Sequence, residues 1–293
     1  MTTIENEIIA QALGPKPTDD ELDFFGLTHQ GKVRADNQDH FLISSLHKRM
    51  DVHLTSLPDP GKVYVEAERL AFLAMVADGV GGGPQGETAS RRALEAVTQY
   101  VSGSMDCYYT ADPTDDQAFT QSLADAALHC HEDLREHSGA DLGKGMATTL
   151  TLMLFVWPRA YLLQVGDSRY YILRDGELTQ ISRDQTLAQV LVDDDVFSRS
   201  EASKSPLAHV LSSAIGGSAT TPVVTGIDND WGYVHLSCSD GLTKHVSDEQ
   251  IAERLRSMTS AKQVCEDLLQ DALDDGGSDN ITVLVARAVR GDT

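Results

Sequence analysis

The stretch from Leu70 to Arg92 constrains the fold most, because an apolar run ends there abruptly at an acid and a cluster of glycines. Residues Leu70 to Ala77 form a continuous apolar run of strand length, which predicts a strand buried on both faces. Asp78 and Gly79 close the run, and a carboxylate at a strand end beside backbone carbonyls suits a hard cation. The glycines that let the backbone adopt positive φ and approach a ligand are Gly79, Gly81, Gly82, Gly83 and Gly86.

The same glycines permit a second interpretation. Gly81, Gly83 and Gly86 satisfy the GxGxxG pattern between a strand and a helix, which is the fingerprint of dinucleotide-binding folds. A pyrophosphate there would lie close to Asp78, and two like charges about 4 Å apart repel by roughly 4 kcal/mol at an effective dielectric constant of about 20. The segments that follow also have the pattern of two helices, not of a helix and a returning strand. A dinucleotide site is therefore the weaker alternative.

The acidic composition limits the partners of this chain. Its formal net charge of -22 over 293 residues argues against nucleic acid and anionic membranes, since both would be repelled. The charge is compatible with divalent cations and basic protein substrates, although solubility explains it equally well. With 41% hydrophobic and 23% charged residues, we expect one large domain, and we predict a monomer.

The cysteines and the N-terminal segment bear on the compartment. The four cysteines are widely scattered, with no CxxC pair and no Cys/His spacing suited to zinc, so reduced thiols in the cytosol are expected. The N-terminal segment carries acids and no basic region, and no apolar run reaches the length of a membrane span. We therefore expect a soluble, cytoplasmic protein. The cysteines are Cys107, Cys130, Cys238 and Cys265.

The pattern along the chain predicts a short tail at residues 1–21 and one domain at 22–290. A long hairpin connection is expected at 46–68, and a polar excursion with one short helix at 183–217. The predicted helices cover residues 87–104, 116–138, 248–258 and 261–273. The predicted strands cover residues 22–31, 41–45, 70–77, 146–157, 160–165, 223–227, 233–238 and 280–289, with a further hairpin turning at Asp175-Gly176. The middle of the chain is therefore antiparallel β, with helices before and after it.

Acids recur at strand ends in separated parts of the chain: Asp78, Asp167, Asp240 and Asp279 each adjoin a predicted strand and a nearby glycine. Taken singly, each is explained as a turn residue, since Asp-Gly and Gly-Asp are common in loops. If the fold gathers these ends, each close pair of carboxylates costs several kcal/mol unless cations neutralise it. Oxygen ligands of this kind would hold Mg²⁺ or Mn²⁺.

Together with Arg34, these acids lie in short motifs that occur in a recognisable order. The motifs resemble those of the metal-dependent protein Ser/Thr phosphatases of type 2C, in their bacterial form, over about residues 22–289. The motifs are Arg34-x-x-Asn37-Gln38-Asp39, Asp78-Gly79-x-Gly81-Gly82, Val165-Gly166-Asp167-Ser168-Arg169, Ser239-Asp240-Gly241-Leu242 and Ser278-Asp279-Asn280.

The resemblance implies an α+β fold: a four-layer αββα sandwich of two mostly antiparallel sheets flanked by helices. It implies a centre of two Mg²⁺ or Mn²⁺ ions, with a third weaker one, at one edge. Asp78 would bridge the two ions, Gly79 would lend its backbone carbonyl, and Asp240 with Asp279 would complete the first site. Asp167, with Asp240, matches the acids that hold the third ion.

The resemblance also implies a reaction: hydrolysis of phosphoserine or phosphothreonine in proteins by a metal-activated water, without a phospho-enzyme. Arg34 matches the arginine that binds the substrate phosphate, and a guanidinium fork fits phosphate oxygens bidentately. Asp39, in the same motif, joins the candidate metal ligands. Residues 183–217 resemble the flap beside the active site. The plain alternative for Arg34 is a surface turn arginine.

Three departures from the family pattern motivate a second hypothesis. Gln38 replaces an acid that often supports the second metal, Val80 stands where eukaryotic members carry a histidine, and Gln185 stands where many members have histidine. A non-catalytic regulator that binds a phosphoprotein on the same fold is therefore the alternative function. Histidines near the motifs are more often structural or solvated than ligands. They are His40, His209 and His245.

Overall fold

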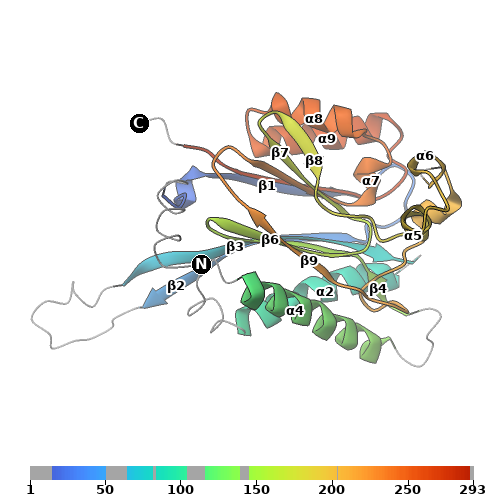
Figure 1. Ribbon diagram of the computed structural model, residues 1–293, viewed down its shortest axis with the longest axis horizontal. Helices are drawn as coiled ribbons and strands as arrows, with labels where there is room; N and C mark the ends of the chain where they lie inside the picture. The colour runs from blue at the N-terminus through green and yellow to red at the C-terminus, as the bar shows by residue number, and fades with distance from the viewer. Residues whose placement is uncertain are drawn as a thin grey trace, which may run out of the picture.

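Two antiparallel sheets stack face to face, and a pair of helices covers the outer face of each sheet (Figure 1). The structure is a computed structural model that describes residues 15–50, 65–81, 84–103, 116–138, 145–202 and 204–290. Every strand pairing in it is antiparallel. The predicted α+β class, a four-layer αββα sandwich, is confirmed.

The first sheet has the strand order β1-β11-β10-β7-β8. Its strands are β1 (Leu22–His29), β7 (Arg169–Arg174), β8 (Glu177–Gln180), β10 (Val234–Cys238) and β11 (Ile281–Ala288). Two helices cover its outer face, α8 (Asp248–Arg256) and α9 (Ala261–Asp274). Apolar residues of these helices, such as Ile251 and Leu268, are fully buried against Leu236 and Val283 of the sheet. The β7–β8 hairpin turns at Asp175 and Gly176, both with positive φ, as the sequence predicts.

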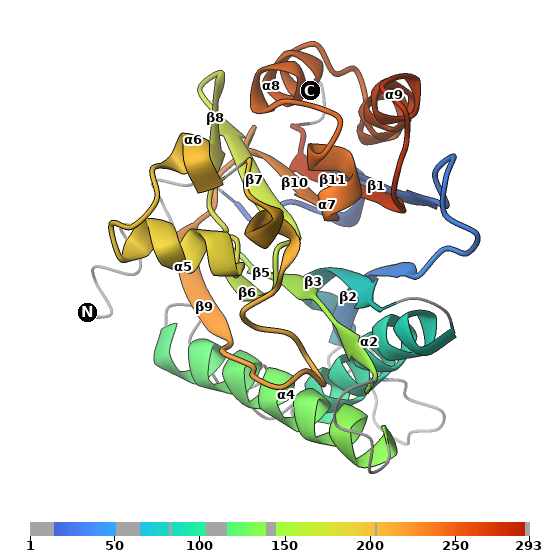
Figure 2. The ribbon, with the colours of Figure 1, turned by 90° about the vertical axis from the view of Figure 1, so that its right-hand side faces the viewer.

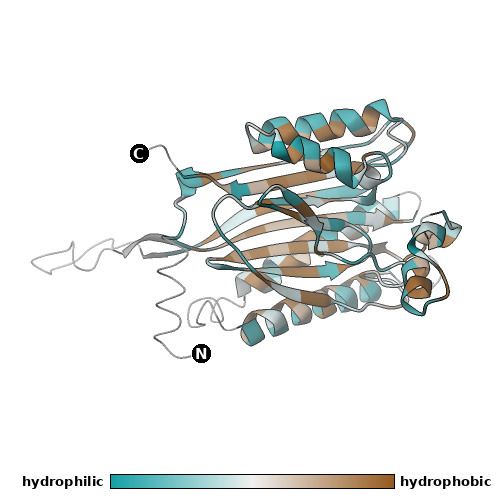
Figure 3. Ribbon diagram, turned by 45° about the horizontal axis from the view of Figure 1, so that its top comes forward, coloured by the Kyte–Doolittle hydropathy of each residue, from teal (hydrophilic) through white to brown (hydrophobic). Residues whose placement is uncertain are grey.

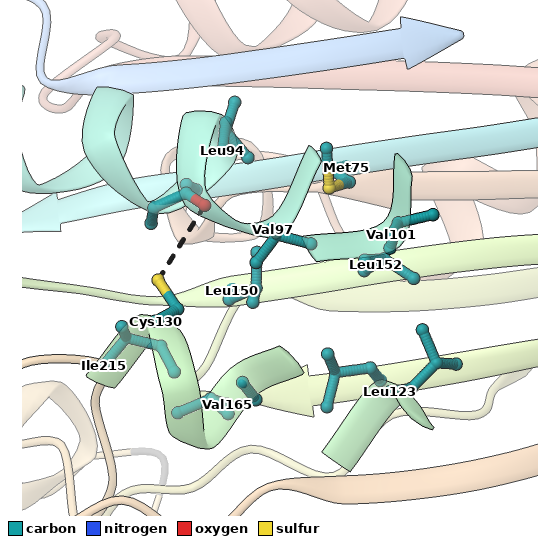
Figure 4. Close-up of a cluster of buried hydrophobic side chains, with 14 of the residues drawn as sticks. Met75, Leu94, Val97, Val101, Leu123, Cys130, Leu150, Leu152, Val165 and Ile215 are labelled. Atoms are coloured by element: carbon teal, nitrogen blue, oxygen red, sulfur yellow. Dashed lines mark hydrogen bonds between the residues drawn. The ribbon is translucent and has the colours of Figure 1, made fainter. Parts of the chain in front are cut away.

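The second sheet has the strand order β2-β3-β5-β6-β9. Its strands are β2 (Asp39–Met50), β3 (Val65–Val80), β5 (Leu150–Val156), β6 (Arg159–Val165) and β9 (Val223–Asp228), and the short β4 (Ala147–Thr148) pairs with the end of β3. Its outer face is covered by α2 (Pro84–Gly103) and α4 (Asp116–His137). Val97 and Leu123 of these helices belong to one buried cluster with Met75 and Leu150 of the sheet, and Figure 4 shows Val97 next to Leu150. The Cys130 thiol donates to the Ala93 carbonyl at 3.8 Å, which ties α4 to α2.

The part of β3 that contains the apolar run of residues 70–77 is buried on both faces, as predicted. Leu73 and Met75 of β3 pack against the helix layer, while Phe72 and Val76 pack between the sheets against residues such as Leu284 of β11. Alternate residues of a strand point to opposite faces, so a continuous apolar run is what a strand between two apolar layers requires. Figure 3 shows hydrophobic residues along the strands and hydrophilic ones on the outer helix surfaces.

Three details differ from the sequence-based expectations. The β2–β3 ladder extends to the pair Met50–Val65, so residues 46–68 are not all connection; the polar residues of this extension hide the strand from a search for apolar runs. The excursion at 183–217 contains α5 (Leu187–Asp193), α6 (Arg199–Ala202) and the 3₁₀ turn η3 (Pro206–His209), where one helix was expected. The single turn α7 (Asp240–Thr243) was not expected, because four residues are too few to show a helical period.

The topology excludes the dinucleotide alternative. A βαβ unit needs a strand returning parallel to β3 after the helix. Here α2 is followed by α4, and the next long strand, β5, pairs antiparallel to β3. The interpretation of Gly81, Gly83 and Gly86 as a dinucleotide fingerprint was therefore wrong, and Gly83 lies outside the described residues.

Other expectations concern the tail, the thiols and membranes. The part of the predicted tail that is described ends in a 3₁₀ turn, η1 (Asp19–Glu21), which Thr18 and Glu21 close as a capping box. Cys130, Cys238 and Cys265 are buried free thiols, and Cys107 lies outside the described residues. Across the described ranges, no helix combines the length and apolar character that crossing a membrane requires.

Candidate active site

Four turns and strand ends meet at one end of the sandwich, the end that faces the viewer in Figure 2. Asp39 at the start of β2 lies directly across the ladder from Asp78 near the end of β3. In the other sheet, Asp240 follows β10 and Asp279 precedes the neighbouring strand β11. The fold therefore gathers acids that are up to 240 residues apart in the sequence.

Two glycines allow backbones to approach closely at this end. A Cβ atom on Gly79 would lie 2.3 Å from the Gly86 carbonyl oxygen, so β3 and the start of α2 can touch only without a side chain there. A Cβ atom on Gly241 would lie 1.8 Å from the Asn280 carbonyl oxygen. Gly241 thus lets α7 pack directly on the backbone that follows Asp279. The glycines serve backbone packing beside the acids.

Asp39 is the most deeply buried acid of the site, with 2% of its surface exposed. Its Oδ2 accepts hydrogen bonds from the hydroxyls of Ser239 and Thr282, both at 2.7 Å. Its Oδ1 has no hydrogen-bond partner among the described residues. Burial raises the pKa of Asp39 to about 6, and the hydroxyl hydrogen bonds only partly offset it. A buried carboxylate oxygen without a partner is costly unless a cation or proton reaches it.

The backbone of Asp78 is fixed by hydrogen bonds to two threonine side chains. Its N–H donates to the Thr149 hydroxyl at 2.9 Å, and its carbonyl accepts from the Thr148 hydroxyl at 2.8 Å. The side chain is partly accessible, yet protein atoms surround it closely enough that burial raises its pKa well above the usual range. The nearby charges of Asp39, Asp240, Asp167 and Asp279 raise that pKa further.

Asp167 lies on a tight loop between β6 and β7. Gly166 has a φ of 106°, and a Cβ there would lie 2.6 Å from the Thr149 methyl group. The Ser168 hydroxyl is hydrogen-bonded to that of Thr149 at 2.8 Å, which fixes the loop beside Asp78. Burial raises the pKa of Asp167 to about 7, with a further contribution from Asp240.

Two cations face the remaining acids. Arg34 contacts Asp279 through both carboxylate oxygens, Nε to Oδ1 at 2.7 Å and Nη2 to Oδ2 at 2.9 Å. Lys244 Nζ lies 2.6 Å from Asp240 Oδ2 and 2.6 Å from Asp279 Oδ2. Burial alone would raise the pKa of Asp279, but the hydrogen bonds from Arg34 and Lys244 outweigh it, so the pKa is lowered.

Lys244 was missed in the sequence analysis. A signal was present, because Lys244 is four residues after Asp240, and oppositely charged residues at that spacing meet on a helix. The signal went unused because α7 itself was not expected.

Asn280 fastens the loop that carries Arg34. Its side-chain amide donates to the carbonyls of Gln30 and Asp36, both at 2.9 Å, and its Oδ1 accepts from the Gln38 N–H at 2.9 Å. Asn280, which follows Asp279 directly, thus fixes the loop that carries Arg34. The Ser278-Asp279-Asn280 motif and the motif that begins at Arg34 are therefore in direct contact.

Some polar residues near the motifs have structural contacts. Gln185 accepts from the Gly166 N–H at 2.9 Å and donates to the Thr221 carbonyl at 3.0 Å, so it joins the base of the flap to the Asp167 loop. His245 accepts from the Ser278 N–H at 2.9 Å and contacts Asp275 at 2.9 Å. In the same way, His40 is hydrogen-bonded to Ser90 of α2 at 2.9 Å. His209 lines the cleft described next, and Val80 is exposed.

A cleft of about 1230 Å³ lies between the flap and the acids. Arg34, Asp167, Asp240 and Asp279 line it, whereas Asp39 and Asp78 are not among its lining residues. The flap contributes basic residues, Arg183 and Arg199. The flap also contributes Asp184 and Asp193, so the cleft is lined by side chains of both signs.

The acids fit a divalent-cation centre, although the side chains are not already arranged as one. Within the ranges that the structure describes, no three Asp, Glu, His or Cys side chains converge as a ready set of ligands. Arg34 engages Asp279, and Lys244 engages both Asp240 and Asp279. The unpartnered Asp39 Oδ1 and the mutually raised pKa values of the buried acids indicate negative charge that still needs a cation.

Fold and site together define a class of protein: a helix-flanked β-sandwich that gathers aspartates, with Arg34 and Lys244 against them, at one end. The chain belongs to the protein phosphatase 2C family, whose sequence profile matches residues 59–275. The matched segment includes Asp78, Asp167 and Asp240, while Arg34 and Asp279 lie outside it.

Individual relatives agree with this family. The serine/threonine protein phosphatase PstP of Mycobacterium tuberculosis is 37% identical over 246 residues, which are 82% of this chain and 44% of the relative. The chain thus spans less than half the length of that relative. The serine/threonine phosphatase stp of Listeria monocytogenes is 28% identical over 215 residues, covering 73% of this chain and 83% of the relative.

Solved structures are similar over nearly the whole fold. The catalytic domain of PstP in complex with two manganese ions matches with a TM-score of 0.69 at 32% identity, covering 92% of this chain and 99% of that one. The Streptococcus agalactiae serine/threonine phosphatase matches with a TM-score of 0.74 at 26% identity, covering 92% and 100%.

Proposed function

We propose that this chain is a metal-dependent protein phosphatase that hydrolyses phosphoserine and phosphothreonine in proteins. The observation that carries the proposal is the convergence of separated acids beside Arg34 at the base of one cleft. Membership of the protein phosphatase 2C family supports it, as do relatives named serine/threonine phosphatases.

The centre would hold two Mg²⁺ or Mn²⁺ ions and a third, weaker one. Asp78 would serve both of the first two ions, Gly79 would lend its backbone carbonyl, and Asp240 with Asp279 would complete the first site. Asp167 serves the third ion, and Asp39 supports the centre from beneath. When bound, such ions supply an activated water and stabilise the charge of the transition state. Carboxylate and carbonyl oxygens are the ligands that these hard cations prefer.

Arg34 binds the substrate phosphate. Its side chain is 53% exposed and already engages two oxygens of Asp279, so the same fork can engage two phosphate oxygens. Phosphate entry and cation binding at Asp279 both free the arginine from that acid. Arg34 acts by orienting the phosphorus for in-line attack, and it transfers no proton because its guanidinium stays charged.

The cleft accepts an extended phosphopeptide between the acids and the flap. Residues 22–290 form the phosphatase domain, with the flap at 183–217 and a tail at 1–21. The flap side of the cleft carries charges of both signs, from Arg183 and Arg199 and from Asp184 and Asp193. We further propose a cytoplasmic monomer with phosphoprotein substrates, and with neither nucleic acid nor membrane as partner, because the net charge of -22 disfavours both.

The experiment that tests the site replaces Asp240. In Asp240→Asn, we expect loss of most Mn²⁺-dependent hydrolysis of an aryl phosphate, with an unchanged circular dichroism spectrum. The control is Asp274→Asn, since Asp274 lies on the exposed side of α9 and accepts a hydrogen bond only from Gln270 among the contacts described. Full activity of Asp240→Asn would refute the assignment of the site.

A further inference from the structure

Lys244 contacts two acids at once. It is the C-cap residue of α7, and its backbone N–H donates to the Asp240 carbonyl at 2.9 Å, so its Cα is fixed by the helix turn. The side chain folds back along that turn. Its ammonium bridges Asp240 and Asp279, which come from two different segments, with 2.6 Å to each Oδ2.

A second lysine–acid pair with the same sequence spacing shows what an ordinary contact looks like. Lys262 lies 3.8 Å from Glu266 on α9, and the two side chains are 64% and 56% exposed. Such surface pairs contribute little to stability. The Lys244 side chain is 25% exposed, and those of Asp240 and Asp279 are 20% and 15% exposed. Partial burial increases the free-energy cost of leaving these two carboxylates without a counter-ion. The Lys244 ammonium supplies that counter-ion.

We infer that the Lys244 ammonium occupies the place between Asp240 and Asp279 that a divalent cation takes in the proposed centre, so that the cation must displace it. The inference rests on the proposed metal-dependent function. Lys244 is then a positioning residue with two effects: it keeps the two acids neutralised in the metal-free protein, and it weakens cation binding.

The sign of both effects follows from competition for the same oxygen atoms. A cation that coordinates Asp240 and Asp279 removes two charge-assisted hydrogen bonds of the ammonium. The displaced ammonium remains tethered nearby and repels the cation. Without the lysine charge, the metal-free state loses its counter-ion and the metal-bound state loses a repulsion. Both changes increase the affinity for the cation.

The first experiment measures Mn²⁺ binding by isothermal titration calorimetry. For Lys244→Gln we expect a Kd lower than that of the unmodified protein by about tenfold or more, which corresponds to about 1.4 kcal/mol. Lys262→Gln is the matched control, since it removes one positive charge from an i,i+4 pair on α9 and should leave the Kd nearly unchanged. Equal or weaker Mn²⁺ binding by Lys244→Gln would overturn the inference.

The second experiment uses the unmodified protein and does not depend on whether the variant folds without metal. Amine acylation followed by mass spectrometry reports the accessibility of each lysine. We expect the acylation of Lys244 to rise several-fold when saturating Mn²⁺ is added, while that of Lys262 stays constant. Unchanged acylation of Lys244 in protein that binds Mn²⁺ would refute displacement and leave the proposed function standing. Absence of Mn²⁺ binding in every variant would refute both the inference and the proposed metal centre.

Discussion

Replacement of Asp39 by asparagine should stabilise the metal-free protein, although it removes a buried and hydrogen-bonded side chain. Asp39 lies directly across the ladder from Asp78, on the same face of the sheet, and its Oδ1 has no partner among the residues that the structure describes. An asparagine oxygen can still accept from Ser239 and Thr282, whose hydroxyls lie 2.7 Å away. The change therefore removes a charge and keeps the hydrogen bonds.

The size of the effect follows from the pKa of Asp39, which burial raises from 3.8 to about 6. At about 1.4 kcal/mol per pKa unit, carrying this charge at pH 8 costs up to about 3 kcal/mol. For a domain of 150–250 residues, each kcal/mol shifts Tm by about 2–4 °C. We expect Asp39→Asn to raise the Tm of the metal-free protein by up to roughly 6–12 °C on that scale.

The assay is differential scanning calorimetry at pH 8, once with EDTA and once with saturating Mn²⁺. With Mn²⁺ the gain should vanish or reverse, because the asparagine supports the cation less well than the carboxylate. The control is Asp23→Asn, which also removes one negative charge but breaks the contact of Asp23 with Arg287 at 3.0 Å and should lower Tm. A lower Tm for Asp39→Asn in EDTA would refute the view that charge accumulates uncompensated at this end.

Three further predictions concern pH, substrate binding and packing. The folded-state pKa values of Asp39 and Asp167, about 6 and about 7, lie above the ordinary 3.8, so the folded metal-free protein binds more protons than the unfolded chain. Its free energy of unfolding should therefore fall as pH rises from about 4 to about 7. Urea unfolding in EDTA measures this free energy, and an increase over that pH range would contradict the prediction. Arg34→Lys should lower kcat/KM for a phosphopeptide by about tenfold or more because the bidentate contact is lost, whereas an unchanged value would exclude Arg34 from phosphate binding. Gly241→Ala should destabilise the fold by roughly 2 kcal/mol or more, since the added Cβ would meet the Asn280 carbonyl at 1.8 Å, and an unchanged Tm would contradict that packing.

The candidate acids could be found from sequence because each leaves a local signal. Asp78 ends an apolar run, and Asp240 and Asp279 adjoin β-branched or apolar strands with glycine next to them. The antiparallel order of the strands, which brings these ends together, depends on long-range pairing that no short window contains. Their convergence came from the resemblance to known motifs and not from periodicity.

The partners of those acids could not be predicted. The contact of Arg34 with Asp279 joins residues 245 positions apart. It depends on the loop that carries Arg34, which is fixed by the hydrogen bond from the Gln38 N–H to Asn280 Oδ1. Lys244 faces two acids only because α7 is a helical turn, and one turn has no period to detect. Extended polar strands fail for a related reason: β2 continues past Leu46 through residues that show no apolar alternation.

The departures from the family pattern have structural roles that the sequence did not suggest. The side chain of Gln185 makes two hydrogen bonds between the flap base and its surroundings. The backbone of Gln38 accepts from the Gly79 N–H at 3.2 Å and donates to Asn280 at 2.9 Å. Although Gln38 replaces an acid, Asp39, Asp78, Asp240 and Asp279 all remain at this end of the sandwich, which favours the phosphatase over the non-catalytic regulator.

The most direct test of the proposed function is release of inorganic phosphate from phosphothreonine and phosphoserine peptides, titrated with Mn²⁺ and Mg²⁺. We predict release that saturates with the metal, stops with EDTA, returns with excess Mn²⁺, and is much slower for a phosphotyrosine peptide. Binding of the phosphothreonine peptide at saturating Mn²⁺ without any phosphate release would contradict catalysis and favour a regulator on the same fold.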